Sequence, residues 1–292
     1  MADLQHDGFD MRLGMSTHLF AFGQLNESHL DLLGEAGFDR LEMWGMSPHV
    51  DWYDPAEVER ISRHIRRSGL RVVSFHLPFY VNFGTNDFKW VSFRNPDPDV
   101  RKLADKMCRH TVDLCGGFGC DIVVLHGNGE EDPAMFDQSD ALFRMGLNEF
   151  LPYCEKRGVR IAIENIVTEM SKTPVLKNLV DEYASDYLWI CLDTGHANLN
   201  ETVPDAIREC GERLLTTHIA DNKGEEDEHL VPYKGNIDWD ETLLLLKEHC
   251  PNLENFTFEL MYPSLGNEAE IDVFREILAE AKAAWERMNR GR

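Results

Sequence analysis

Ser68–Ser74 reads Ser-Gly-Leu-Arg-Val-Val-Ser, and Arg157–Ile163 reads Arg-Gly-Val-Arg-Ile-Ala-Ile. Both stretches have the same order of features, namely a helix end, a glycine that terminates it, and a short buried strand. Gly37 occupies the same place after an earlier helical segment. This repeated unit is typical of a helix that connects two parallel strands, and it therefore predicts a parallel sheet.

Short β-rich runs alternate with longer segments of helical period along the chain. The predicted strands are Arg12–Ser16, Arg40–Trp44, Arg71–His76, Ile122–His126, Arg160–Glu164, Trp189–Asp193, Leu215–Ile219 and Phe256–Leu260. The predicted helices include Glu27–Ala36, Pro55–Arg67, Val100–Cys115, Phe136–Lys156, Trp239–His249 and Glu268–Met288. Several strands are continuous apolar runs, as expected for parallel strands that are covered on both faces.

Eight such units without a proline-rich or serine-rich linker predict an α/β protein with one closed (β/α)₈ TIM barrel. We expect residues 1–292 to form this single domain, with residues 1–11 as a flexible N-terminal tail. A doubly wound open sheet is the alternative. No Gly-x-Gly-x-x-Gly follows an early strand, and the polar residues do not gather at one switch point, so the barrel is favoured.

The composition is that of an acidic protein with enough apolar residues for a large core. Hydrophobic residues make up 43% of the chain, and the formal net charge is −23 at pH 7. This charge repels phosphate backbones, so we expect no nucleic-acid partner. The N-terminal segment is polar, and no apolar run is long enough to cross a membrane. Seven scattered cysteines without a Cys-x-x-Cys pair indicate reduced core residues in a cytoplasmic protein.

Metal-binding or acid–base residues end nearly every predicted strand. In a (β/α)₈ barrel the active site lies at the C-terminal strand ends, where side chains from different strands converge. These positions hold His76, His126, Glu164, Asp193, His218 and Glu259, and the earlier strands add His18, Glu42 and Trp44. A single histidine at a strand end is more often a hydrogen-bonded core residue. Six such residues at the same position of successive units predict a functional site.

The residue types in this set indicate a divalent metal. A buried glutamate such as Glu164 or Glu259 is unfavourable unless a cation, a proton or a partner compensates its charge. Together with Asp193 and His218, these glutamates offer three carboxylates and one imidazole, which suit Mn²⁺, Mg²⁺, Co²⁺ or Fe²⁺. No thiolate is in position, which excludes a cysteine-rich structural zinc site. We expect one divalent ion, Mn²⁺ in the first place, with Zn²⁺ as a further alternative.

Three motifs carry a resemblance to a known family. They are Ile-Glu-Asn at Ile163–Asn165, Asp-Thr-Gly-His at Asp193–His196, and the long segment from His218 to Trp239. With them the chain resembles the xylose isomerase-like TIM barrels from about Arg12 to its last helix. That family includes sugar-phosphate isomerases and epimerases, ketose 3-epimerases, inosose dehydratases and endonuclease IV. The resemblance implies the same barrel fold and a metal-dependent activity.

The resemblance also implies roles for individual residues. The four metal ligands of the sugar-isomerase branch match Glu164, Asp193, His218 and Glu259. His196 matches a histidine that contacts substrate, and His76 matches a further position that faces the pocket. We expect the substrate-binding set to comprise His76, His126, His196, Lys223, His229 and Trp44. In this set Lys223 would bind a hydroxyl or phosphate group, and Trp44 would form an apolar wall for a sugar face.

The predicted reaction moves a proton next to a carbonyl. A divalent metal that chelates a carbonyl and the adjacent hydroxyl acidifies the neighbouring C–H. Glu164 and Glu259 would then act as the acid–base pair, because one carboxylate removes a proton and the other returns one. This predicts a sugar or sugar-phosphate isomerase or epimerase. An inosose-type dehydratase with the same chemistry is the alternative. Binding without turnover is disfavoured, because the costly buried carboxylates are all retained.

Endonuclease IV, a DNA-repair nuclease with three zinc ions, is a less favoured interpretation. Its nine metal ligands match His76, His126, Glu164, Asp193, His196, His218, Asp227, His229 and Glu259. The net charge of −23 is poorly suited to DNA. The sugar-isomerase branch also commonly carries an Asp-x-His-Leu element in this loop, so the spacing of Asp227 and His229 does not discriminate. The acidic surface therefore favours a small sugar or polyol as the substrate.

Two segments bear on the substrate. Free-ketose 3-epimerases carry an arginine shortly after the histidine ligand, whereas this chain has Asp-Asn-Lys-Gly at Asp221–Gly224, which weighs against that activity.

The segment Leu77–Asp99 is long for a loop between a strand and a helix and is rich in aromatic residues. Loops of this length are often lids or binding loops. A packed surface loop or a contact in a homodimer is equally open.

Overall fold

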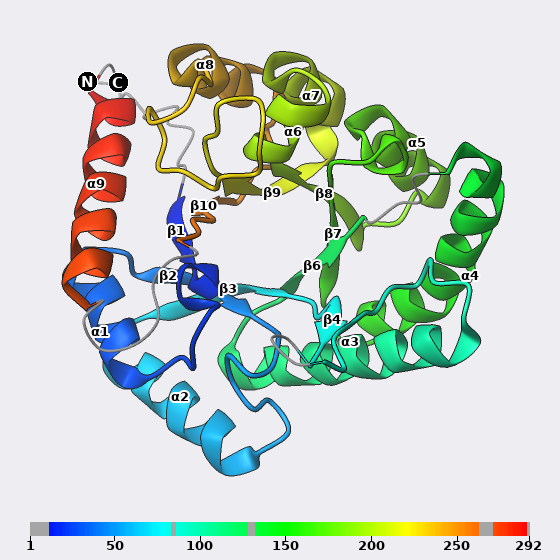
Figure 1. Cartoon of the computed structure of the whole chain (residues 1–292), viewed down its shortest axis with the longest axis horizontal. Helices are drawn as coiled ribbons and strands as arrows, with labels where there is room; N and C mark the ends of the chain where they lie inside the picture. The colour runs from blue at the N-terminus through cyan, green and yellow to red at the C-terminus, as the bar shows by residue number, and fades with distance from the viewer. Residues whose placement is uncertain (1–11, 83–85, 128–131, 263–270, 291–292) are drawn as a thin grey trace, which may run out of the picture.

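The computed structural model describes residues 12–82, 86–127, 132–262 and 271–290. Within them eight parallel strands close into a barrel in the order β1-β10-β9-β8-β7-β6-β3-β2. The strands are β1 (Arg12–Ser16), β2 (Arg40–Trp44), β3 (Arg71–His76), β6 (Ile122–His126), β7 (Arg160–Glu164), β8 (Leu188–Asp193), β9 (Leu214–Ile219) and β10 (Asn255–Phe258). The helices surround these strands (Figure 1), which confirms the predicted (β/α)₈ TIM barrel.

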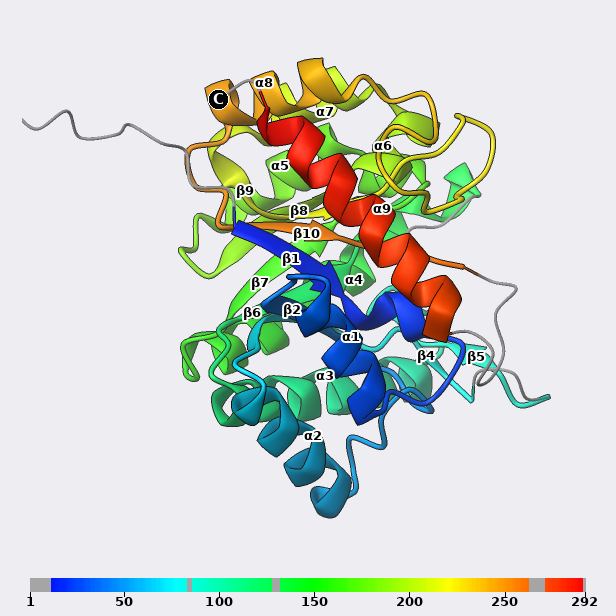
Figure 2. The ribbon, with the colours of Figure 1, turned by 90° about the vertical axis from the view of Figure 1, so that its left-hand side faces the viewer.

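The outer layer consists of helices that follow the strands. They are α1 (Glu27–Glu35), α2 (Pro55–Arg67), α3 (Pro98–Phe118), α4 (Phe136–Glu155), α5 (Thr173–Tyr183), α6 (Thr194–Asn200), α7 (Val203–Cys210), α8 (Trp239–His249) and α9 (Ile271–Asn289). Short 3₁₀ turns occur at Thr17–Phe20, Pro133–Met135, Glu169–Ser171 and Gly211–Arg213. The last helix, α9, lies between α8 and α1 and completes the ring (Figures 1 and 2).

Aspartate carboxylates cap the N-termini of several helices. The side chains of Asp54, Asp97, Asp193 and Asp238 accept hydrogen bonds from backbone N–H groups at the first turns of α2, α3, α6 and α8. An aspartate at this position satisfies donors that have no partner inside the helix and complements the positive end of the helix dipole. At the other end of α3, Gly119 adopts φ 72°, a left-handed conformation that favours glycine.

The barrel interior has two levels that come from the same strands. Side chains alternate between the interior and the helix side along a strand, so residues two apart share a face. On this interior face the lower level is a small apolar cluster of Ile122, Val124, Ala162, Cys191 and Leu215. Two residues further along three of these strands come His126, Glu164 and Asp193. The register holds the upper level together, because His126 lies opposite Glu164, and Asp193 lies opposite His218.

The predicted elements are confirmed with small differences at their ends, except that the predicted start of the last helix, Glu268, lies outside the described residues. Strands β8 and β9 each begin one residue earlier than predicted, and α3 is longer at both ends. Strand β10 ends at Phe258 rather than Leu260, although Glu259 N still donates to Ile219 O at 3.2 Å. All seven cysteines are buried and free, as expected for reduced core residues. The predicted tail, residues 1–11, lies outside the described residues.

The long loop after β3 contains a short antiparallel hairpin of β4 (Tyr80–Val81) and β5 (Lys89–Trp90). Figure 2 shows this hairpin and the loop after β9 at the end of the barrel toward which the strands run. Both segments therefore lie on the face where the strand-end side chains converge. Among the described residues, no helix combines the length and the apolar character that a membrane crossing would need.

Candidate metal centre and catalytic site

The four predicted ligands lie together at the C-terminal ends of β7, β8, β9 and β10. One donor atom from each of Glu164, Asp193, His218 and Glu259 lies within 4.8 Å of the other three. All four side chains are buried, with exposed fractions of 0–3%. Three carboxylates and an imidazole at such distances form a donor set that can hold a divalent cation.

His218 is surrounded by carboxylates on both edges of its ring. Its Nδ1 lies 2.9 Å from Glu164 Oε1 and 3.2 Å from Glu259 Oε2, and its Nε2 lies 3.0 Å from Glu42 Oε1. The Nε2 contact lacks hydrogen-bond alignment and is therefore electrostatic. Burial favours the neutral ring, but the surrounding acidic groups outweigh it and raise the pKa of His218 well above its usual value.

Two carboxylate oxygens of the cluster are buried without a hydrogen-bond partner among the described residues. They are Asp193 Oδ2 and Glu259 Oε1. Burial raises the pKa of the Asp193 carboxyl and raises the pKa of Glu259 to about 7. Unpaired buried carboxylate oxygens are costly, and a cation between them would satisfy both. The residues present therefore fit a divalent metal.

Asn165 fixes the position of Asp193. Its Nδ2 donates to the backbone O of Asp193 at 3.0 Å, and its Oδ1 accepts from Asp193 N at 2.7 Å. Asp193 Oδ1 in turn accepts from His196 N at 2.7 Å. Because Oδ1 is engaged as the cap of α6, Oδ2 is the oxygen that remains to face the cluster.

Three other pocket histidines are oriented by backbone carbonyls. The Nδ1 atoms of His76, His196 and His229 lie 2.8–2.9 Å from the carbonyl oxygens of Leu77, Asn165 and Glu259, to which they donate. In each ring the other nitrogen, Nε2, therefore faces a carboxylate, which is Glu164 for His76 and Asp227 for His196 and His229. A carbonyl that accepts from one ring nitrogen is the usual device for directing the other nitrogen at a metal or substrate.

These histidines form two further clusters beside the first. His196 Nε2 and His229 Nε2 each lie 3.2 Å from Asp227 Oδ2. Burial opposes the charge on His229, but the Asp227 carboxylate outweighs it and raises the pKa of His229 to about 9. In the other cluster, His76 Nε2 and His126 Nε2 lie 3.2 Å and 3.7 Å from Glu164 Oε2. Each cluster has donor atoms close enough to hold a cation.

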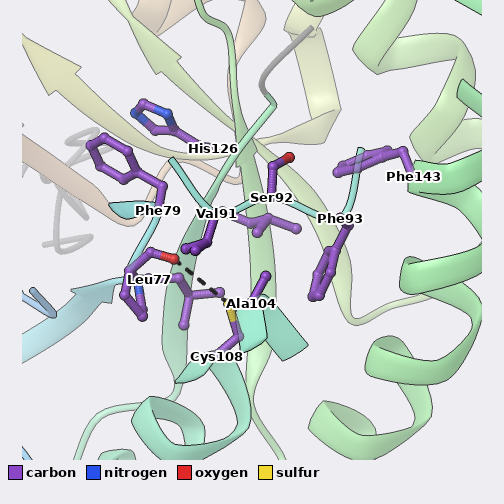
Figure 3. A pocket seen from close by; sticks show the side chains of 11 residues that line it. Leu77, Phe79, Val91, Ser92, Phe93, Ala104, Cys108, His126 and Phe143 are labelled. Atoms are coloured by element: carbon purple, nitrogen blue, oxygen red, sulfur yellow. Dashed lines mark hydrogen bonds between the residues drawn. The ribbon is translucent and has the colours of Figure 1, made fainter. Parts of the chain in front are cut away.

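Aromatic rings line one side of the histidine clusters. The Trp44 ring lies 4.3 Å from His18 and 4.5 Å from His76, measured between ring centres, and its Nε1 donates to Tyr80 Oη at 3.2 Å. Phe79 stacks on His126 at 3.8 Å with an angle of 9° between the rings. Figure 3 shows these two rings side by side above a small cavity, whose lining includes Leu77, Val91, Ala104 and Cys108. This cavity is mostly apolar and lies outside the carboxylate cluster.

The structure brings nearly all of the predicted site residues together. The four ligand candidates and the substrate-binding candidates His76, His126, His196, His229 and Trp44 all lie in these connected clusters. Lys223 is the exception. Its side chain is 63% exposed, and its Nζ lies 2.6 Å from Glu228 Oε1 on the surface of the loop after β9. The roles of these residues stay predictions.

Glu42 and His18, which the sequence places near the strand ends without a specific role, also lie in the site. Glu42 is fully buried and accepts hydrogen bonds from Ser16 Oγ at 3.2 Å and Ser74 Oγ at 2.8 Å. Burial lowers the pKa of His18 well below its usual value, and its Nδ1 has no hydrogen-bond partner among the described residues. A glutamate inside the apolar run Leu41–Trp44 was the available signal for Glu42.

Asp221 organises the long loop after β9. Its Oδ1 accepts from Ile237 N at 3.2 Å, and its Oδ2 accepts from Trp239 Nε1 at 2.9 Å. Backbone hydrogen bonds in both directions also join it to Leu230 at 2.8 Å. Asp221 is fully buried, so these bonds hold both ends of the segment that carries Asp227 and His229.

Comparisons with known proteins agree with this architecture. The protein y4fM of Sinorhizobium fredii is 29% identical over 233 residues, which cover 72% of this chain and 73% of that protein. A D-psicose 3-epimerase of Enterocloster bolteae is 43% identical over 65 residues, or 22% of this chain and 20% of its own. The solved structure of a D-tagatose 3-epimerase-like protein superposes with a TM-score of 0.73 at 22% identity, over 96% of this chain and 99% of its own.

The family assignment rests on a match over most of the chain. Residues 30–277 match the family model described as xylose isomerase-like TIM barrel. This range includes every strand from β2 to β10 and all four ligand candidates. The chain belongs to the xylose isomerase-like TIM barrel family.

Proposed function

We propose that the protein is a divalent-metal-dependent sugar isomerase or epimerase that transfers a proton next to a carbonyl. One observation carries this proposal. The donor atoms of Glu164, Asp193, His218 and Glu259 converge within 4.8 Å, and the buried oxygens Asp193 Oδ2 and Glu259 Oε1 have no hydrogen-bond partner among the described residues. Such a set is costly to keep without a cation. Mn²⁺ suits these mostly hard donors.

The proposed chemistry uses the two glutamates for proton transfer. A bound divalent cation would polarise the substrate carbonyl and make the adjacent C–H more acidic. Glu164 ends β7 and Glu259 directly follows β10, and both face Nδ1 of His218. We assign them as the groups that remove and return the proton at carbon. His76, His196 and His229 present their Nε2 edges toward the carboxylates, where they can bind substrate hydroxyls.

The names of the relatives support a sugar as the substrate. One relative is a D-psicose 3-epimerase, and one structural neighbour is a D-tagatose 3-epimerase-like protein. The conserved fold alone does not fix the reaction, because this barrel hosts many chemistries. The polar cluster at the strand ends is what connects this chain to proton transfer.

Hydrogen exchange with solvent tests the proposal. The Mn²⁺-loaded protein would be incubated in D₂O with D-fructose, D-psicose, D-tagatose and inososes, and deuterium at carbon would be followed by NMR. We expect uptake at the carbon beside the carbonyl of at least one compound. Loss of water in place of epimerisation would identify the dehydratase alternative. Absence of uptake with every compound would refute the proposed proton transfer.

A nuclease related to endonuclease IV is the second candidate function. Its specific support is that the nine predicted metal ligands all fall into the three connected clusters around Glu164 and Asp227. The net charge of −23 opposes DNA binding. A nicking assay on an abasic-site oligonucleotide with the zinc-loaded protein decides between the two. We expect no nicking, and strand cleavage that depends on zinc would favour the nuclease.

A further inference from the structure

The two arms of the loop after β9 lie side by side. The first arm holds Asn222, the second arm holds Gly235 and Asn236, and Asn236 N donates to Asn222 O at 2.9 Å. A Cβ atom at residue 235 would lie 2.1 Å from Asn222 O, so only glycine allows the arms to come this close. Asp227 and His229 lie between the arms in sequence, and the loop lies beside α6 (Figures 1 and 2).

Asn198 on α6 is hydrogen-bonded to both arms. Its Nδ2 donates to Asn222 Oδ1 and to Asn236 Oδ1, each at 2.7 Å. An amide NH₂ group has two protons, so both donors of Asn198 are used. The same helix carries His196, whose Nε2 lies 3.2 Å from Asp227 Oδ2. These two hydrogen bonds therefore connect the helix that carries His196 with the loop that carries Asp227.

The partners of Asn198 require a side chain with two N–H donors at this position. Asn222 Nδ2 donates to Gly195 O at 2.8 Å, and Asn236 Nδ2 donates to Lys223 O at 2.9 Å. These bonds fix the orientation of both amide groups, so each group presents its oxygen to Asn198. Aspartate has the same size as asparagine but no donor, and its carboxylate would face two acceptors.

The position of Asp227 depends on the loop that carries it. Asp227 Oδ2 lies 3.2 Å from the Nε2 atoms of His196 and His229, yet the Asp227 side chain is 39% exposed. His229 and Tyr233 in this loop have φ values of 46° and 72°, which are unfavourable for residues with a side chain. Such a backbone persists only when contacts with the surrounding structure hold it. The hydrogen bonds to α6 supply contacts of this kind.

We infer that Asn198 is a positioning residue for the histidines that bind substrate. Its two N–H groups hold both arms of the β9 loop on α6, and this keeps Asp227 between His196 and His229. The buried Asp221 joins the loop to itself and to Trp239, whereas Asn198 joins the loop to the helix that carries His196. The binding of substrate by these histidines rests on the proposed function.

Asn198→Asp tests the inference because it keeps the size of the side chain and removes both donors. Amide hydrogen exchange in buffer with Mn²⁺, followed by mass spectrometry, reports on the loop without any substrate. We expect residues 223–236 to exchange about tenfold or more faster than in the parent. Unchanged exchange in this segment overturns the inference. Asn198→Ala should show the same change to a smaller extent, and it replaces the aspartate variant if that variant does not fold.

Two matched controls separate lost donors from added charge. Asn200→Ala removes an amide from the same helix, whose Nδ2 donates to Thr168 O at 2.9 Å, and should leave exchange of the β9 loop within about twofold of the parent. Asn236→Asp adds the same charge as Asn198→Asp but keeps an oxygen that accepts from Asn198. Its effect should be smaller. An equal effect of Asn236→Asp and Asn198→Asp would assign the change to charge and would overturn the inference.

Kinetics distinguish positioning from a general loss of stability. For a ketose that the parent accepts, deuterium uptake by Asn198→Asp should show KM raised by about tenfold and kcat changed by less than about threefold. The reason is that the hydrogen bonds of Asn198 do not involve Glu164 or Glu259. A lower Tm with an unchanged KM would mean that Asn198 only stabilises the fold, and would overturn the inference.

Hydrogen exchange also separates this inference from the proposed function. Absence of deuterium uptake with every ketose in the parent refutes the proposed function. Amide exchange of residues 223–236 then decides the role of Asn198 without a substrate. Faster exchange in Asn198→Asp than in Asn236→Asp supports the positioning of the loop, and equal exchange in the parent and Asn198→Asp overturns it.

Discussion

The lower and upper levels of the barrel interior come from the same strands and differ in almost every property. In β7 the lower level has Ala162 and the upper level has Glu164, and in β8 the corresponding pair is Cys191 and Asp193. All four side chains are buried. The lower level gains free energy from burial, because apolar surface leaves water. The upper level loses free energy on burial, because carboxylates leave water.

One fold can therefore place stabilising residues and chemically active residues on the same strands. A shift of two residues along a strand keeps the side chain on the interior face and moves it by about 6.6 Å toward the open end. The apolar level can therefore fill the barrel while the next level carries charge. Substitutions at the lower level should change stability, and substitutions at the upper level should change metal binding and turnover.

The largest effect is expected at Glu259. In Glu259→Gln the carboxylate that returns or removes a proton is lost, and the buried polar volume is kept. We expect proton exchange with substrate to fall by about 10²–10⁴-fold while the far-UV circular dichroism spectrum is unchanged. Initial rates of deuterium uptake measure the loss.

The matched control is Glu201→Gln, since Glu201 holds Thr173 at 2.7–3.0 Å at the start of α5, away from the cluster. This control should retain the exchange rate. A Glu259→Gln protein as active as the Glu201→Gln protein would remove Glu259 from the proposed mechanism.

A substitution at the lower level should show the reverse pattern. Ile122 is 1% exposed and packs in the apolar cluster of the barrel interior. Ile122→Ala should lower the free energy of unfolding by about 2–5 kcal/mol through lost burial and a cavity. Denaturant unfolding of the metal-free protein measures this change. The affinity of the folded variant for Mn²⁺ should equal that of the parent, and a tenfold weaker affinity would contradict the separation of the two levels.

A substitution at Glu42 shows how strongly metal binding depends on a carboxylate that contacts the ligand candidate His218 from outside the cluster. Its carboxylate lies 3.0 Å from His218 Nε2, on the ring edge opposite Nδ1, and is held by Ser16 and Ser74. A carboxylate at this place orients a histidine ligand and raises its basicity. We expect Glu42→Gln to weaken Mn²⁺ binding by about 10–100-fold, measured by calorimetry.

Ser74→Ala is a milder companion, because it leaves the Glu42 charge and removes one hydrogen bond. Its effect on Mn²⁺ affinity should have the same direction and be smaller. If both variants bind Mn²⁺ like the parent, Glu42 has no part in positioning His218.

The last and most gradual expected effect is a pH dependence of metal binding. Burial raises the pKa of Glu259 to about 7, and neighbouring acids raise the pKa of His218 well above its usual value. Both groups hold protons in the metal-free protein at low pH and must release them to bind a cation. Mn²⁺ affinity should therefore rise with pH, more steeply below pH 7 than above it, by at most about tenfold per pH unit for each proton. Affinity that is constant between pH 6 and pH 8 would contradict this assignment.

The barrel could be predicted because its signals are local. A glycine after a helix and a short apolar strand recur around Gly69 and Gly158, and both glycines adopt a positive φ. The C-terminal ends of the strands converge in a closed barrel. The sequence alone therefore predicts that Glu164, Asp193, His218 and Glu259 lie close together. Their contacts with one another follow from the register of the strands.

Other features depend on contacts that a sequence does not display. The hairpin within Leu77–Asp99 depends on pairing between Tyr80 and Trp90, which are ten positions apart. Lys223 was expected to face the substrate, but its partner Glu228 lies in a loop whose path depends on buried Asp221. The sequence places Glu42 near the strand ends but gives it no specific role, because its hydroxyl partners lie on two neighbouring strands.

We propose that the upper level of the barrel binds one divalent cation through four side chains. Metal content per chain after loading with Mn²⁺ and removal of free metal, measured by mass spectrometry for the parent and for Asp193→Asn, tests it most directly. We expect one Mn²⁺ per chain in the parent and a large loss in Asp193→Asn, because Asp193 Oδ2 is a buried oxygen of the cluster without a hydrogen-bond partner among the described residues. No bound metal in the parent would contradict it, and so would three zinc ions per chain after loading with zinc.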